Sequence, residues 1–172
     1  MDDQVVLVDT NDNECGTMGK HDAHLKGKLH RAFSIVIVNK KKYQMLLQKR
    51  ALGKYHSPGL WTNACCSHPM PGEDLLVAAK RRLAEEMGFV CELNKIFDFI
   101  YKVKLESPYT EYEYDHVFLG EYAHDPDPDP YEAADWKWMD IAVLSEQIKH
   151  DSQRYTFWFK LIIEKMIQNS II

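Results

Sequence analysis

The side chains best suited to take part in a reaction lie in one segment, Trp61-Thr-Asn-Ala-Cys-Cys-Ser-His-Pro69. Two adjacent cysteines, Cys65 and Cys66, stand there beside a serine and a histidine, in a stretch rich in glycine and proline. A cysteine in such a loop can be a reactive thiol, although a buried and inert cysteine is the commoner role for either one taken alone. The segment therefore contains a candidate reactive thiol.

Histidines and carboxylates elsewhere in the chain could form a metal site. Glu111 and Glu113 flank Tyr112 on a predicted strand, and residues two apart on a strand project to the same face. Both carboxylates can therefore enter one site. Three imidazoles with two carboxylates suit a borderline divalent ion such as Zn²⁺ or Mn²⁺, although any single histidine is more often a solvated or core residue. The candidate imidazoles are those of His24, His30 and His68.

A helix is predicted from Glu73, because apolar residues recur at helical spacing as far as Met87 and Gly88 offers a left-handed stop. This helix carries part of the Nudix box, but Arg82 stands where Nudix hydrolases place a glutamate used for magnesium. The reversed charge should weaken a hydrolytic metal cluster and adds a donor suited to a phosphate oxygen. The alternative is an ordinary amphipathic helix with a charged outer face. Box positions are taken by Ser67 in place of the first glycine, then Glu73, Arg81, Leu83, Glu85, Glu86, Gly88 and Phe89.

The cysteine segment closely resembles the signature of the type I isopentenyl diphosphate isomerases, a family of the Nudix superfamily, and the resemblance covers most of the chain. It implies an isomerase of isoprenoid biosynthesis that interconverts isopentenyl and dimethylallyl diphosphate by metal-dependent protonation and deprotonation. It assigns the family's acid/base cysteine to Cys66, with Cys65 as a bystander. The resemblance also places Cys66 and Glu113 on opposite sides of the substrate, with Tyr101 assisting the Glu113 carboxylate. It does not indicate which of the two groups protonates the alkene in each direction of the reaction.

The family's metal ligands also fall on residues of this chain. The resemblance implies a site for Zn²⁺, Mn²⁺ or Mg²⁺ formed by His24, His30, His68, Glu111 and Glu113. The spacing between His24 and His30 differs by one residue from that in some relatives, so His21 remains an alternative first ligand. His56 and His116 match no ligand position and are expected to be structural.

The implied substrate is a small diphosphate, which needs cations that can approach its oxygen atoms. The family's diphosphate-binding positions are matched by Lys20, Arg50, Lys54 and Arg82. Glu86 matches the carboxylate that helps to hold a Mg²⁺ ion against the phosphate oxygens, and no flavin is implied. A carbocation-like state also needs a dry pocket with an aromatic face, for which Trp61 and Trp158 are the expected walls.

The residues also fit two other functions. A Nudix hydrolase that cleaves a nucleoside diphosphate linkage would follow from the helix signature alone, but Arg82 and the Cys66 segment argue against it. A non-catalytic module stabilised by zinc would explain the histidines and glutamates, but it leaves Arg82, Glu86 and Cys66 without a shared purpose. The isomerase is therefore the favoured function.

These residues must be positioned by the predicted secondary structure. Strands are predicted at residues 5–9, 32–39, 43–48, 96–105, 112–122 and 136–139, and helices at 73–87 and 152–172. A turn at Ser107-Pro108 and a long irregular loop over residues 51–72 are also expected, while residues 124–130 are predicted to form a solvated, stiff loop rather than a calcium loop. This order favours a mixed sheet with helices on both faces. The α/β fold is expected to be a Nudix-type α/β/α sandwich, with residues 1–172 forming a single domain.

Composition limits the possible partners. The 172 residues fit one domain, and an apolar share of 45% is enough for a hydrophobic core. With 21 Lys and Arg against 26 Asp and Glu, the formal charge is -5, so nucleic acid is not an expected partner and an anionic substrate needs a local basic cluster. We see no secretory signal, no run able to span a bilayer and no obligate protein partner. A cytoplasmic protein with free cysteines is expected.

Overall fold

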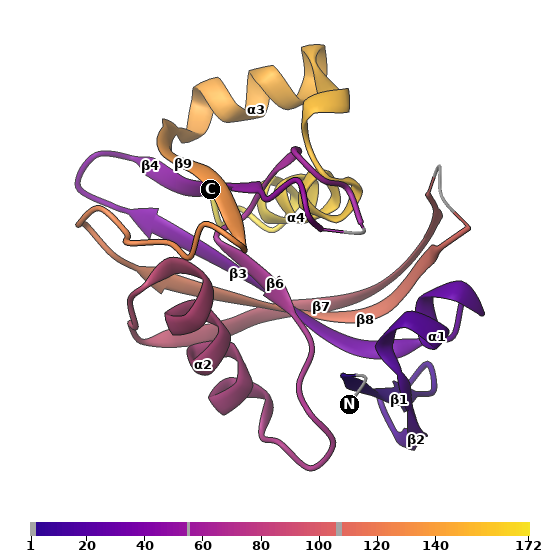
Figure 1. Cartoon of the computed structure of the whole chain (residues 1–172). Coiled ribbons are helices and arrows are strands. Elements are labelled where there is room, and N and C mark those ends of the chain that lie inside the picture. The colour runs from indigo at the N-terminus through magenta and orange to yellow at the C-terminus, as the bar shows by residue number, and fades with distance from the viewer. Residues whose placement is uncertain (1–2, 55, 106–107) are drawn as a thin grey trace.

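The computed structural model of the chain describes residues 3–54, 56–105 and 108–172. Within these residues, nine strands form one mixed sheet and helices cover both of its faces (Figure 1). The elements are β1 (Gln4–Val8), β2 (Glu14–Gly19), α1 (Lys20–Leu25), β3 (His30–Asn39), β4 (Gln44–Arg50), β5 (Trp61–Thr62), β6 (Cys65–Ser67), α2 (Leu75–Met87), β7 (Leu93–Lys104), β8 (Thr110–Glu121), β9 (Ala133–Asp140), α3 (Ile141–His150), a short 3₁₀ turn (Ser152–Arg154) and α4 (Phe157–Gln168).

Strand β3 organises the sheet. It pairs in antiparallel fashion with β1, β4 and β6, and in parallel with β8. β8 is also paired with β7, β4 with β5 and β9, and β1 with β2. The mixed sheet expected from the order of the elements is therefore confirmed.

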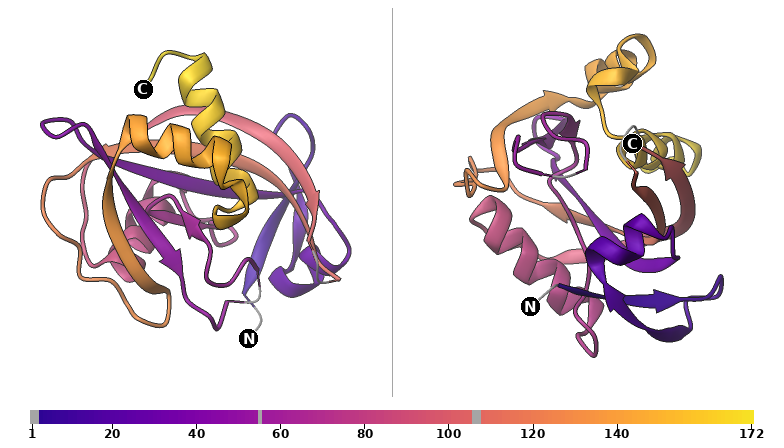
Figure 2. Two further views of the ribbon diagram at one scale, coloured as in Figure 1. Left: turned by 90° about the horizontal axis from the view of Figure 1, so that it is seen from above. Right: turned by 45° about the vertical axis from the view of Figure 1, so that its right-hand side comes forward.

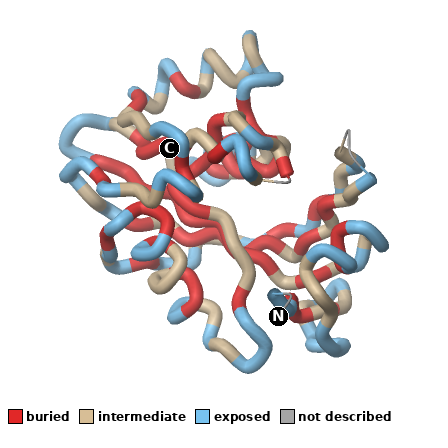
Figure 3. Tube along the Cα trace, viewed as in Figure 1, coloured by how far each residue is buried: buried red, intermediate tan, exposed pale blue. Residues whose placement is uncertain are grey.

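The almost continuous apolar sequence of β3 is explained by burial on both faces of the sheet. Ile35 and Ile37 pack in one core with Leu83 of α2, while Val36, which projects the other way, packs in a second core with Ile162 of α4. Figure 2 shows α2 on one side of the sheet and α3 and α4 on the other, and Figure 3 shows buried residues concentrated along the central strands. The predicted α/β/α sandwich is confirmed.

Helix α2 begins two residues later than predicted, because Asp74 is its N-cap. The Asp74 carboxylate accepts hydrogen bonds from the backbone N–H groups of Leu76 and Val77, both at 3.0 Å. Glu73 lies before the cap, and its carboxylate accepts hydrogen bonds of 2.8 and 2.9 Å from the Arg81 guanidinium. Glu73, the first glutamate of the Nudix box, therefore connects the segment before α2 to the helix through Arg81.

Gly88 ends α2 in the left-handed conformation, with φ of 74°, as the sequence predicted. A Cβ at this position would collide with the carbonyl oxygen of Asp127, and an L-residue with this φ is strained as well. We expect Gly88→Ala to lower the free energy of unfolding by about 3 kcal/mol in urea denaturation.

Gly72→Ala is the matched control for that substitution. Gly72 has φ of 77°, and a Cβ there would meet no described atom within 4 Å. Gly72→Ala should therefore lower the free energy of unfolding through backbone strain alone, by about 1 kcal/mol. Equal losses for Gly72→Ala and Gly88→Ala would contradict the proposed collision with Asp127.

The loop of residues 124–130 has four exposed residues, as expected of a solvated loop, but it also covers the C-terminal end of α2. Pro126 is buried. The backbone N–H groups of Asp127 and Asp129 donate hydrogen bonds of 3.1 Å to the carbonyl oxygens of Met87 and Glu86. The loop thereby satisfies two carbonyl groups near the end of the helix.

Other elements differ from the predicted ones at both ends and in the middle of the chain. β2, α1 and α3 were not predicted, and β5 and β6 interrupt the expected loop of residues 51–72. The helix predicted over residues 152–172 was wrong at its start, because Ser152–Arg154 forms a 3₁₀ turn and α4 begins at Phe157. The predicted turn at Ser107-Pro108 lies partly outside the described residues.

Two global expectations can be compared with the structure. The four cysteines are free thiols, as predicted. None of the helices in the described ranges combines the length and apolarity that crossing a bilayer would require.

Candidate active site

Most of the predicted site residues converge on one cavity, whose walls come from three helices and four strands. Of the predicted set, only His30 and Trp61 lie outside its lining. The lining residues are Lys20, His24, Arg50, Lys54, His56, Cys66, Ser67, His68, Arg82, Glu86, Tyr101, Glu111, Glu113 and Trp158.

The thiol of Cys66 is held in this cavity by the pairing of β6 with β3, which places Cys66 opposite Ser34. Its Sγ lies 3.0 Å from the indole Nε1 of Trp158, which donates to the sulfur, and 3.6 Å from the hydroxyl of Ser34. The Ser34 hydroxyl donates a 2.8 Å hydrogen bond to the buried Asp115 carboxylate. The sulfur is therefore contacted by polar groups from β3 and α4.

Asn63 also contacts this thiol. Its Nδ2 donates hydrogen bonds to the carbonyl oxygens of Ile35 and Cys65, at 3.0 and 2.8 Å, so its Oδ1 faces Cys66 and accepts from the S–H group at 3.1 Å. Burial, followed by the nearby Asp115 carboxylate, raises the pKa of Cys66 to about 12. Cys66 therefore carries a proton at neutral pH.

Cys65 points to the other side of β6, as expected for the preceding residue on a strand. It is fully buried in the core that includes Ala78 and Leu83 of α2. Burial raises the pKa of the Cys65 thiol well above its ordinary value. Only Cys66 of the two adjacent cysteines reaches the cavity.

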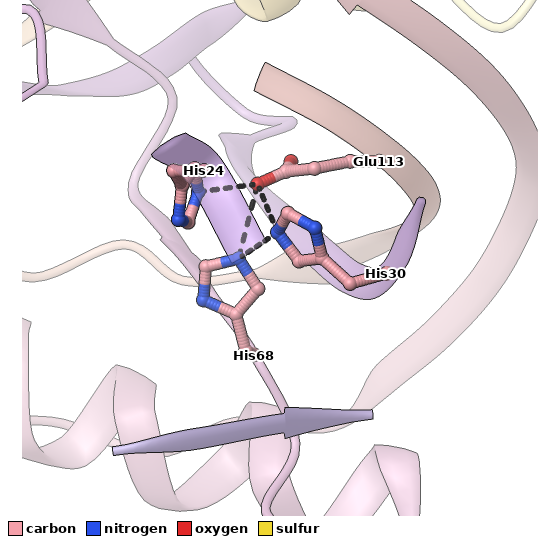
Figure 4. Close-up of side chains that lie close together, drawn as sticks. All are labelled: His24, His30, His68 and Glu113. Carbon is pink, nitrogen blue, oxygen red and sulfur yellow. Dashed lines mark hydrogen bonds and ion pairs between the residues drawn. The ribbon is translucent and has the colours of Figure 1, made fainter. Parts of the chain in front are cut away.

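Three histidines surround one carboxylate oxygen of Glu113 (Figure 4). The Nε2 atoms of His24, His30 and His68 lie 3.8, 3.5 and 3.0 Å from Glu113 Oε1. The Nε2 atoms of His30 and His68 are 3.2 Å apart. These four side chains form a group that could hold a metal ion.

Strand register explains why the cluster forms from residues so distant in sequence. His30 begins β3 and lies directly opposite Glu113 in the parallel pairing of β3 with β8. His68 follows Ser67, which pairs with Phe33 of the same strand. His24 comes from α1, where it is buried.

The protonation pattern of the imidazoles fits metal binding. The Nδ1 atoms of His24 and His30 hydrogen-bond to the carbonyl oxygens of Lys20 and Lys28, at 2.7 and 2.8 Å. A carbonyl oxygen can only accept, so each Nδ1 carries the proton and each Nε2 lone pair is directed to the cluster. Burial lowers the pKa of His68 to about 3, which keeps this imidazole neutral as a ligand must be.

Two carboxylates share the hydroxyl group of Tyr101. Its oxygen lies 3.0 Å from Glu111 Oε2 and 2.7 Å from Glu113 Oε2. Burial and the neighbouring Glu113 charge raise the pKa of Glu111 to about 8. Burial acts in the same direction on Glu113, but the three neighbouring histidines outweigh it and hold the pKa of Glu113 well below its ordinary value. A cation bound here would relieve the repulsion between these two carboxylates.

The chain is similar to known proteins over most of its length. The NUDIX domain family matches residues 28–159. Isopentenyl-diphosphate Delta-isomerase 1 of Aromatoleum aromaticum is 51% identical over 97% of this chain and 94% of its own length. Isopentenyl-diphosphate Delta-isomerase 2 of Photorhabdus laumondii is 50% identical over 99% of this chain and 96% of its own length. The chain belongs to the type I isopentenyl-diphosphate Delta-isomerase family.

A solved structure with a similar fold is DR0079 from Deinococcus radiodurans, which covers 94% of this chain and 98% of its own with a TM-score of 0.78 at 14% identity. A NUDIX hydrolase from Alicyclobacillus acidocaldarius covers 78% and 89% of the two chains, with a TM-score of 0.58 at 14% identity. At such identities the similarity concerns the fold alone.

In this member of the isomerase family, cationic side chains line one part of the cavity. Burial lowers the pKa values of Lys20 and Lys54. The Arg82 guanidinium donates to Glu86 at 2.6 Å and to Glu132 at 3.1 Å, and Lys54 pairs with the same Glu132. The four predicted cations, Lys20, Arg50, Lys54 and Arg82, all line the cavity together with Glu86.

Glu132 and Gln48 belong to this network and were not predicted from the sequence. Gln48 is buried and donates a 3.1 Å hydrogen bond to Glu86 Oε2. Its position opposite Trp136 in the pairing of β4 with β9 depends on the assembled sheet. Neither residue stands in a motif, so no sequence signal pointed to them.

The two predicted tryptophan walls differ in position. Trp158 lines the cavity, and the Arg50 guanidinium lies 5.3 Å from its ring centroid. Trp61 is buried on β5 outside the cavity lining, and Lys137 Nζ lies 4.1 Å from its ring. Trp61 therefore lies outside the lining that Trp158 helps to form.

The remaining histidines separate into three environments. His21 is exposed and hydrogen-bonds to Tyr109 at 2.8 Å, so the structure brings His24 rather than His21 to the cluster. His116 is buried with its Nε2 3.1 Å from Asp12, as expected for a structural residue. His56, also expected to be structural, instead lines the cavity beside the cluster. Its place in the same Gly/Pro-rich loop as Lys54 was the available sequence signal.

Proposed function

We propose that this cavity interconverts isopentenyl and dimethylallyl diphosphate, with Cys66 and Glu113 as the acid/base pair. The observation that carries the proposal is that one cavity brings together the Cys66 thiol, the Glu113 carboxylate and a group of cationic side chains. The strong similarity to proteins named isopentenyl-diphosphate Delta-isomerase supports the same activity.

The proposed reaction adds a proton to one end of the alkene and removes a proton from the carbon on the other side of the cationic centre. Substrate and product therefore contain the same atoms. Cys66 holds a proton and Glu113 can accept one, and the reverse reaction begins from the opposite assignment. β6 and β8 both pair with β3, so these two side chains reach the substrate from different strands. The Tyr101 hydroxyl donates to Glu113 and would orient its carboxylate.

Binding of the diphosphate is assigned to the cationic part of the cavity. Lys20, Arg50, Lys54 and Arg82 would contact the phosphate oxygens, and Glu86 would hold a Mg²⁺ ion beside them. The hydrocarbon part would lie near Trp158, whose ring offers a π-face to developing positive charge. Trp61 has no role in this proposal.

His24, His30, His68, Glu111 and Glu113 would hold Zn²⁺, Mn²⁺ or Mg²⁺. Such an ion would supply a fixed positive charge beside Glu113 and so favour its ionised form. The proton transfers themselves are assigned to the side chains of this chain.

The direct test is incubation of the protein with isopentenyl diphosphate and Mg²⁺. We expect an acid-labile allylic diphosphate and no release of phosphate. Phosphate release would instead indicate a hydrolase, and recovery of unchanged substrate would favour a non-catalytic metal-stabilised module.

Replacement of Arg82 by glutamate is expected to raise KM by at least about tenfold. The Arg82 guanidinium already contacts Glu85 at 2.7 Å as well as Glu86 and Glu132. Glutamate at this position would add a fourth carboxylate where the substrate's anionic group is proposed to bind. Steady-state kinetics measures the effect.

Arg81→Gln and Arg82→Gln form a matched pair for this test. Arg81 is the adjacent arginine on α2, but it pairs with Glu73 and Glu85 and does not line the cavity. The Arg82 variant should raise KM and the Arg81 variant should not. An unchanged KM and kcat in Arg82→Glu would remove Arg82 from the binding site.

A further inference from the structure

A fourth imidazole lies at the histidine and glutamate cluster. His56 belongs to the segment between β4 and β5, is only 4% exposed and lines the same cavity. Its Nδ1 lies 3.5 Å from Glu111 Oε1, and its ring centroid lies 4.4 Å from that of His24. His24, His56 and Glu111 form a second group, whose ligand atoms all lie within 4.8 Å of one another, beside the group of His24, His30, His68 and Glu113.

His24 connects this trio to the cluster around Glu113 and limits the number of ions. Its Nδ1 hydrogen-bonds to the Lys20 carbonyl oxygen, so only its Nε2 lone pair can bind a metal. The same Nε2 faces Glu113 Oε1 at 3.8 Å. Because one lone pair binds one ion, His56 and Glu111 would complete the coordination of the cluster's ion rather than form a second centre.

One distance within each group suits neighbouring ligands of one ion. Metal–nitrogen bonds of about 2.1 Å at right angles place adjacent ligand atoms about 3 Å apart. The separation of 3.2 Å between the His30 and His68 Nε2 atoms is close to this value, and that of 3.5 Å between His56 and Glu111 is only slightly longer.

The backbone of His56 is fixed by an arginine of the cavity. Arg50 Nε and Nη2 donate hydrogen bonds of 3.0 and 2.9 Å to the His56 carbonyl oxygen. Backbone hydrogen bonds of Arg50 with Gly59 and Leu60 close the same segment. The His56 ring also makes an edge contact with Tyr109, at a centroid distance of 5.2 Å. These contacts present the imidazole to the cluster.

We propose that His56 is a sixth side-chain ligand of the ion held by His24, His30, His68, Glu111 and Glu113. This inference rests on the metal site of the proposed function. It implies that Arg50 positions His56 through the backbone while facing the diphosphate. The metal centre and the cationic part of the cavity would then be connected by one short loop.

The test compares Co²⁺ binding to metal-free wild type, His56→Phe and His56→Gln. Phenylalanine keeps an aromatic ring against His24 and Tyr109 but has no nitrogen, so it separates packing from ligation. We expect both variants to bind Co²⁺ about ten- to hundredfold more weakly, by competition with a chelator, and to have altered visible spectra of bound Co²⁺. His21→Gln, an exposed histidine on the same helix as His24, should change neither measurement.

His68→Ala distinguishes failure of this inference from failure of the metal site. Wild-type affinity and an unchanged Co²⁺ spectrum in His56→Phe or His56→Gln, with loss of the ion in His68→Ala, would overturn the role of His56 and leave the proposed site intact. Absence of tight Co²⁺ binding by the wild type would overturn both. Circular dichroism of the metal-free proteins shows which His56 variant is folded. The Co²⁺ affinity and spectrum of that variant are the ones compared with wild type.

Discussion

Replacing Cys66 with alanine is expected to lower kcat for isomerisation by about 10²–10⁴, the usual contribution of a positioned acid or base. Cys66 is the cysteine of the adjacent pair that reaches the cavity, and its proton faces Asn63 Oδ1 while Trp158 donates to its sulfur. No other thiol lines the cavity among the described residues. Steady-state kinetics with isopentenyl diphosphate measures the loss.

Cys65→Ala is the matched control, because the two cysteines are neighbours on β6 and project to opposite sides. Its thiol packs in the core against α2, so the variant should keep most of its activity and lose about 1 kcal/mol of stability. Melting temperatures separate loss of packing from loss of chemistry. Equal activities of Cys65→Ala and Cys66→Ala would exclude Cys66 as the acid/base group.

Much of the fold could be predicted from the sequence because local patterns determined it. β3 is buried on both faces and therefore has a nearly continuous apolar sequence, and α2 has helical periodicity followed by Gly88. α1 could not be predicted in this way, since six largely polar residues are too few to show periodicity. Its helix is evident only from tertiary structure, where Ala23 and His24 are buried.

The candidate site also contains residues that a local pattern predicts and residues that depend on the tertiary structure. Glu111 and Glu113 share a face because they are two apart on a strand, which the sequence alone indicated. His56 and Glu132 depend on the paths of loops, and loop paths leave no periodic signal. The position of Trp61 outside the cavity lining has a related cause, because it depends on the pairing of the two-residue strand β5 with β4.

Removal of the metal is expected to lower the melting temperature as well as the activity. The proposed ligands come from α1, β3, the end of β6, and β8, so an ion would connect segments that only the folded chain brings together. A ligand at 1,000 times its Kd stabilises the folded state by about 4 kcal/mol. For a domain of this size that corresponds to a rise in Tm of about 10 °C. Calorimetry of metal-free and metal-loaded protein measures the difference.

His68→Ala should abolish most of this metal-dependent rise in Tm, because its Nε2 lies 3.0 Å from Glu113 Oε1 and 3.2 Å from His30 Nε2 at the centre of the cluster. His116→Ala is the control, since it removes a buried imidazole that contacts Asp12 instead. That variant should lower the Tm of the metal-free and metal-loaded forms equally. A full equivalent of tightly bound ion in His68→Ala would remove this residue from the ligand set. A metal-free wild type that melts at the temperature of the loaded protein, and isomerises with Mg²⁺ alone, would refute the site as a whole.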